Sequence, residues 1–116
     1  MEVKWEKCVP GAWCSFDALE LDKVPGDGVY VIWHGGENPR WVRVGMGMIR
    51  DRIEKHRKDP NITKYRQFGG LFVTWAIVPA HLQAGIENYL ADQLKPLVGE
   101  RFPNVQPIPV NLPGAA

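Results

Sequence analysis

The sequence predicts a small α/β (α+β) protein in which a three-stranded, mainly antiparallel sheet is flanked by two helices. Runs of β-branched and aromatic residues at 28–34, 40–45 and 71–78 have the composition of strands. Residues 48–58 and 81–95 show the apolar spacing of helices instead. The order of strand, strand, helix, strand and helix is typical of a small sheet with helices packed against it.

Turn-forming residues separate the first two strands. Pro25-Gly26-Asp27-Gly28 is a strong turn signal ahead of the first strand. Gly35-Gly36-Glu37-Asn38-Pro39 lies between the first strand and the second, which predicts a β-hairpin with a long loop.

Proline ends both predicted helices. The residue before a proline is driven out of the α region, so Asp59-Pro60 ends the first helix and Pro96 ends the second. The polar residues 61–69 are expected to form a loop. The apolar run 71–78 that follows is expected to be a buried central strand.

The two ends of the chain carry weaker signals. Val3–Lys7 could form a short strand. The tail at 98–116 is rich in proline and is expected to be extended, with Val105–Leu112 able to lie along a sheet edge. The length of the chain predicts one domain, 1–116.

Composition narrows the classes of protein. A net charge of +1 with 23% charged residues indicates neither a polyanion-coating nor an acidic protein, so any nucleic acid must meet a local patch. The start of the chain has no apolar signal core, and the run at 71–78 is too short to span a bilayer, so we expect a cytoplasmic protein without membrane contact. Cys8 and Cys14 match neither a zinc spacing nor a disulfide framework and are expected to be structural thiols.

Two charged positions break the helical pattern. Arg52 and His56 fall inside the apolar arc of the first helix, and Glu87 lies between two apolar groups on the second. Charged side chains are rarely buried without a partner. Either Arg52 and Glu87 pair with each other or reach out at the sheet edge, or they serve a ligand.

The order of these residues resembles the GIY-YIG endonuclease family. Gly28-Val29-Tyr30 is similar to the first family triplet, and Arg43-Val44-Gly45 stands at the second, with Arg43 in place of its tyrosine. The pair Arg52 and His56 is similar to the helix signature, and Glu87 to the metal-binding glutamate. The resemblance covers about 25–97, which it identifies as a GIY-YIG-like core.

The resemblance implies cleavage of phosphodiester bonds in DNA with a divalent metal. Glu87 would hold one Mg²⁺ or Mn²⁺, a hard cation that keeps several waters. Arg52 offers a permanently charged fork for the scissile phosphate, and lysine there should be a poor substitute. The family's later asparagine would be Asn104, which lies further from Glu87 than the pattern expects.

The remaining candidates each have a structural alternative. Tyr30 could orient the attacking water and accept its proton if Arg43 stabilises a phenolate, or it could be a half-buried strand tyrosine with a surface hydroxyl. His56 could position a phosphate or a water, or it could favour the C-terminal helix dipole.

A basic cluster surrounds Arg52. Seven basic residues between positions 50 and 66 outnumber three acidic ones, and such an excess attracts nucleic acid in a salt-dependent way, although it could also be a solvated face. Besides Arg52, the basic residues are Arg50, Lys55, Arg57, Lys58, Lys64 and Arg66. Tyr65 and Phe68 could stack on a base or pack into the protein.

Two functions therefore stay open from the sequence. The first is a small metal-dependent endonuclease acting on DNA, branched or damaged DNA included, either alone or with a partner protein. The second is a module on the same fold that binds nucleic acid or protein with weakened or lost catalysis, which the replacement at Arg43 favours.

Overall fold

A four-stranded antiparallel sheet forms the centre of the computed structural model, which describes residues 1–99 and 104–114. Its strands, in the spatial order β1-β4-β2-β3, are β1 (Cys14–Ser15), β2 (Asp27–His34), β3 (Arg40–Met48) and β4 (Leu71–Ile77). The expected α+β class is confirmed, but the sheet has four strands and not three. The additional strand β1 has only two residues, too few to show a period in the sequence.

The predicted hairpin is confirmed. β2 and β3 pair antiparallel from Asp27 opposite Met48 to His34 opposite Arg40, with a bulge between Ile32 and Trp33. β3 continues past the predicted end at Gly45 to Met48 and leads directly into α1 (Ile49–His56).

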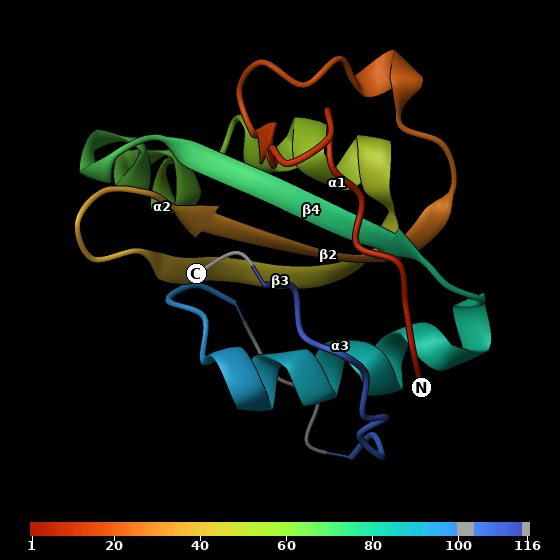
Figure 1. Ribbon diagram of the computed structural model, residues 1–116. Helices are drawn as coiled ribbons and strands as arrows, with labels where there is room; N and C mark the ends of the chain where they lie inside the picture. The colour runs from red at the N-terminus through yellow and green to blue at the C-terminus, as the bar shows by residue number, and fades with distance from the viewer. Residues whose placement is uncertain (100–103, 115–116) are drawn as a thin grey trace.

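The two main helices cover opposite faces of the sheet, α1 on one side and α3 (Ala80–Leu94) on the other (Figure 1). Alternation along β2 supplies both cores, because successive side chains point to opposite faces. Tyr30 and Ile32 pack with the residues of α1, whereas Val29 and Val31 pack with those of α3.

The expected loop at 61–69 is wrong. The chain forms α2 (Pro60–Thr63) and the 3₁₀ helix η2 (Lys64–Phe68) there. The Asp59 side chain accepts a hydrogen bond from the Asn61 amide and caps α2, with Pro60 in the first helical turn. An Asp-Pro pair that ends one helix can therefore also begin the next.

The N-terminal segment is extended but is not a strand. Between residues 3 and 7, only the Glu6 amide donates to a β4 carbonyl, that of Trp75, at 2.9 Å. The Thr74 hydroxyl donates to the Glu6 carbonyl at 2.7 Å. A second 3₁₀ turn, η1 (Leu21–Lys23), follows before the hairpin.

The part of the C-terminal tail that was expected along a sheet edge, Val105–Leu112, packs on α3 instead. The Ile108 amide donates to Gly85, and the Asn88 side chain donates to the Val105 carbonyl. The residues that meet the edge of β3 are Leu97 and Val98, whose amides donate to β3 carbonyls. No helix within residues 1–99 and 104–114 is both long and apolar enough to cross a membrane.

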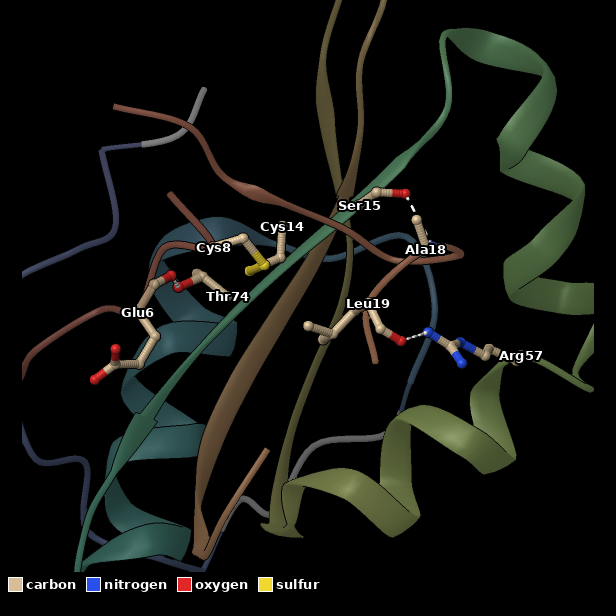
Figure 2. The surroundings of a disulfide bond; sticks show 8 residues. All are labelled: Glu6, Cys8, Cys14, Ser15, Ala18, Leu19, Arg57 and Thr74. Atoms are coloured by element: carbon tan, nitrogen blue, oxygen red, sulfur yellow. Dashed lines mark hydrogen bonds between the residues drawn. A yellow bond between two sulfur atoms is a disulfide. The ribbon is translucent and has the colours of Figure 1, made fainter. Parts of the chain in front are cut away.

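Cys8 and Cys14 form a disulfide, so the expectation of free structural thiols is wrong (Figure 2). A bridge between Val9 and Ala12 turns the chain back on itself and leaves the two cysteine Cα atoms 5.0 Å apart. This separation lies within the usual range for a disulfide. Two cysteines in a short turn show no recognisable spacing in the sequence, so the sequence did not indicate this disulfide.

Asn111 links the two ends of the chain. Its side chain accepts from the Val3 amide at 2.7 Å and donates to the Val3 carbonyl at 3.0 Å. We expect Asn111→Ala to lower the free energy of unfolding by about 1–3 kcal/mol, because both partly buried backbone groups lose their partner. Denaturant unfolding measures this loss, with the exposed Asn104→Ala as the matched control. Equal stability of the two variants would show that the link contributes nothing.

Candidate functional site

Tyr30 lies in the middle of the sheet with its hydroxyl turned toward α1. It is 1% exposed, so the alternative of a surface hydroxyl is wrong. Its hydroxyl is 2.6 Å from Nε2 of His56. Gly45 is its partner on β3, and a Cβ on that glycine would overlap the phenol. The ring therefore occupies the space that a side chain at position 45 would need.

Both partners of this hydrogen bond are neutral at pH 7. Burial raises the pKa of Tyr30 to about 12, although the charges of Arg43 and Arg52 act in the opposite direction. Burial also lowers the pKa of His56 to about 4, helped by the Arg43 charge. The direction of this bond follows the histidine tautomer: with the proton on Nδ1, the phenol donates and Nε2 accepts. Arg43 acts on Tyr30 in the predicted direction, but burial outweighs it.

Arg43 and Arg52 approach Tyr30 from two different elements. Arg43 pairs with Ile32 across the hairpin and so shares the sheet face of Tyr30. Its Nε atom is buried and has no hydrogen-bond partner among the described residues. Arg52, in the second turn of α1, lies near the Gly47 backbone, where a Cβ would come 3.0 Å from its Nε atom.

Glu87 is held in a low-dielectric position on α3. It is 8% exposed, and its Oε1 atom is buried without a hydrogen-bond partner in the part of the chain that the structure describes. Burial raises the pKa of this carboxyl, and the charges of Arg43 and Arg52 only partly compensate. Within the same residues no ion pair joins Glu87 to Arg52, so the alternative of a salt bridge between them is wrong.

The side chains of Tyr30, Arg43, Arg52 and Glu87 line one cavity of about 350 Å³ at the β3 edge of the sheet. His56 does not line it. Its lining residues are Tyr30, Arg43, Val44, Gly45, Met46, Arg52 and Glu87. A larger groove of about 820 Å³ shares the two arginines. It is lined by Arg43, Asp51, Arg52, Glu54, Lys55, His56, Lys58, Asp59 and Pro60.

The predicted basic cluster is divided by the fold. Lys55 and Lys58 line the groove. Arg57 instead donates two hydrogen bonds to backbone carbonyls of the N-terminal segment, and Arg66 pairs with Asp17 in two bonds of 2.8 Å. The Arg50 guanidinium lies 3.7 Å from the carboxylate of Asp51, the next residue in the chain. The basic surface at the groove is therefore smaller than the sequence indicated.

The aromatic residues beside this cluster have local partners. Lys64 lies over the ring of Tyr65, 5.4 Å from its centroid. Tyr65 also packs against the core and stacks on His34, while Phe68 is half exposed. Core packing thus accounts for Tyr65 but not for Phe68.

Sequence reasoning missed two features of the site. The hydrogen bond between Tyr30 and His56 joins residues 26 apart, and no local pattern indicates it. The need for glycine at position 45 follows from the ring that crosses it. Asn104 is exposed in a turn and is not among the residues that line the cavity.

The donors present fit one weakly held hard cation. Glu87 offers an unpartnered carboxylate oxygen, and the described residues contain no group of three or more His, Cys, Asp or Glu side chains that could hold a metal. This excludes a closed zinc-type cage in that part of the chain. A single carboxylate suits Mg²⁺ or Mn²⁺, which keep most of their waters and take further oxygen ligands from a phosphate.

Comparisons with known proteins gave no relative: no protein-family model, no curated protein and no solved structure matches this chain.

Gly45→Ala tests the packing of Tyr30. The added methyl group overlaps the phenol, so the ring must move and the hydrogen bond to His56 is lost. We expect a loss of about 1–3 kcal/mol in the free energy of unfolding and a fall of the Tyr30 pKa toward 10, measured by ultraviolet titration. Gly114→Ala, where the methyl group meets open space, is the control. An unchanged titration would contradict this packing.

Glu87→Gln tests the cost of the buried carboxylate. The pKa of Glu87 in the folded state lies above its ordinary value of 4.5. Above pH 4.5 the unfolded state loses this proton before the folded state does, so the stability of the protein falls as the pH rises from 4.5 through the folded-state pKa. The glutamine variant lacks this loss. We expect its melting temperature, relative to that of the wild type, to rise between pH 4 and pH 7.5. Glu37→Gln, on the exposed hairpin loop, should show no such difference; the same pH dependence in both variants would refute the assignment.

Proposed function

We propose that this protein is a metal-dependent endonuclease of the GIY-YIG type that hydrolyses phosphodiester bonds in DNA. The observation that carries the proposal is one cavity lined by Tyr30, Arg43, Arg52 and Glu87, in which the charges of two arginines act on a carboxylate with an unpartnered oxygen. Phosphodiester hydrolysis needs a cationic phosphate site, a group that takes a proton from water and a stabiliser for the leaving oxygen. The cavity holds candidates for each.

Arg52 and Arg43 bind the scissile phosphate in this mechanism. Their guanidinium groups remain charged at any working pH and can donate two parallel hydrogen bonds to phosphate oxygens. Both arginines line the cavity, and the buried Nε of Arg43 has no partner among the described residues. The two arginines stabilise the negative charge that develops on the phosphoryl oxygens in the transition state.

Tyr30 and His56 handle the proton. The attacking water gives its proton to the Tyr30 oxygen as the phenol passes its own proton to Nε2 of His56, along the 2.6 Å hydrogen bond. His56 is a weak base in the free protein because burial and Arg43 disfavour its charge. A bound phosphate adds negative charge beside it and so raises its pKa toward the working range.

Glu87 is the residue that would hold the divalent ion. When bound, Mg²⁺ or Mn²⁺ supplies positive charge to stabilise the leaving oxygen. The carboxylate is buried and without a partner before any ion enters, so binding relieves an unfavourable position. With one protein ligand, the affinity for the ion depends on bound phosphate.

Cleavage of plasmid and branched DNA with Mg²⁺ or Mn²⁺ tests the proposal. We expect Glu87→Ala and Arg52→Ala each to lower the rate roughly 10²–10³-fold, as loss of a charge-stabilising group does elsewhere. Arg52→Lys should also fall well below the wild type, because a point charge cannot replace the fork. Glu37→Ala and Arg40→Ala, exposed residues of the same types outside the cavity, should retain the wild-type rate.

The second candidate, a binding module without catalysis, rests on Arg43 and on the protonated phenol. Two arginines around a neutral tyrosine bind an anion without activating water. In that case the wild type and both alanine variants would leave every substrate uncut, and DNA binding would still weaken in Arg52→Ala. This result would replace the first proposal with the second.

A further inference from the structure

We propose that Cys8 is a thiol-exchange site, at which a low-molecular-weight thiol opens the Cys8–Cys14 disulfide and loosens the N-terminal segment from the sheet and from α1. The inference needs neither DNA nor a metal and is independent of the nuclease proposal.

The two sulfur positions differ in access. Cys8 is exposed, whereas Cys14 is 0% exposed within the core on the α1 side. A cavity of about 660 Å³ opens beside Cys8, and Lys7, Leu19, Trp75 and Ile77 are among its lining residues. The cavity gives an attacking thiol a path to Cys8, and its charged lining residues balance, with Glu6 and Glu20 opposite in sign to Lys7 and Lys23.

Reduction of the disulfide takes two thiol–disulfide exchange steps. A thiolate bonds to Sγ of Cys8, the disulfide bond breaks, and Cys14 leaves as a thiolate that takes up a proton. A second thiolate then attacks the small-molecule sulfur of the mixed disulfide and releases Cys8. Two external thiols are oxidised to one disulfide, and the protein disulfide is reduced to two thiols. The Cys14 thiol can stay in the core, because a free cysteine packs as a small apolar residue.

The disulfide joins two attachments to β4. Before the disulfide-closed ring, the Glu6 amide donates to the Trp75 carbonyl. The Thr74 hydroxyl donates to the Glu6 carbonyl (Figure 2). On the other side, Cys14 pairs with Val73, and the Phe16 amide donates to the Leu71 carbonyl at 2.9 Å. Closing a short ring between these points removes freedom from the open chain. Without the disulfide each attachment depends on its own few hydrogen bonds.

Arg57 connects this segment to the candidate site. It follows His56 at the end of α1 and donates to the carbonyls of Phe16 at 2.9 Å and Leu19 at 2.7 Å. Figure 2 shows its guanidinium reaching from the helix to Leu19. Movement of this segment therefore removes two hydrogen bonds from the end of the helix that carries His56.

Mass spectrometry and hydrogen exchange test the proposal on the full chain, without DNA or metal. After brief exposure to a small thiol and an acid quench, we expect the mixed disulfide on Cys8 and a free thiol at Cys14. In the reduced protein the amides of Glu6 and Phe16 should exchange roughly tenfold faster or more, while that of Val31 in β2 should not change.

Cys8→Ser is the matched variant, since it removes the exposed sulfur and leaves the core residue Cys14 intact. Without any added thiol, this variant should show the same fast hydrogen exchange at Glu6 and Phe16 as the reduced wild type. Added thiol should not change it further. An adduct mainly on Cys14, or unchanged exchange at Glu6 and Phe16 after reduction, would overturn the proposal.

Discussion

Tyr30 on β2 lies opposite Gly45 on β3, and its phenol fills the space that any other residue at position 45 would occupy. This crossing turns the ring toward α1, where its hydroxyl is hydrogen-bonded to Nε2 of His56. The hairpin register thus decides which helix residue can meet the phenol. A shift by one residue would send Tyr30 to the α3 face, because side chains alternate along a strand.

Both main helices contribute side chains to the site. Glu87 comes from the helix on one face of the sheet, while Arg52 and His56 come from the helix on the other. Glu87 and Arg52 line the same cavity at the edge strand β3, and His56 lines the neighbouring groove. The buried carboxylate, phenol and imidazole all shift in pKa toward their neutral forms. Such destabilised groups are common at functional sites, where a bound ligand relieves them.

The N-terminal segment supports this arrangement from outside. It is attached to β4 by backbone bonds, closed by a disulfide and linked to α1 by Arg57. The basic residues around Arg52 consequently have two roles. Lys55 and Lys58 face the groove, while Arg57 and Arg66 hold the segment in place.

The sequence by itself determined the elements with a clear period: the hairpin, the third long strand and the two main helices. It also singled out Arg52, His56 and Glu87, because a charge inside an apolar helical stripe is a local signal. Short or locally capped elements escaped it, since two residues of β1 or the single turn of α2 carry too little periodicity.

Only the tertiary structure decided how these residues meet. It placed Tyr30 against His56, kept Glu87 apart from Arg52, paired Cys8 with Cys14 and divided the basic cluster between groove and scaffold. Each of these outcomes depends on packing between segments distant in the chain or on a turn without periodicity. Local patterns carry no information on such contacts.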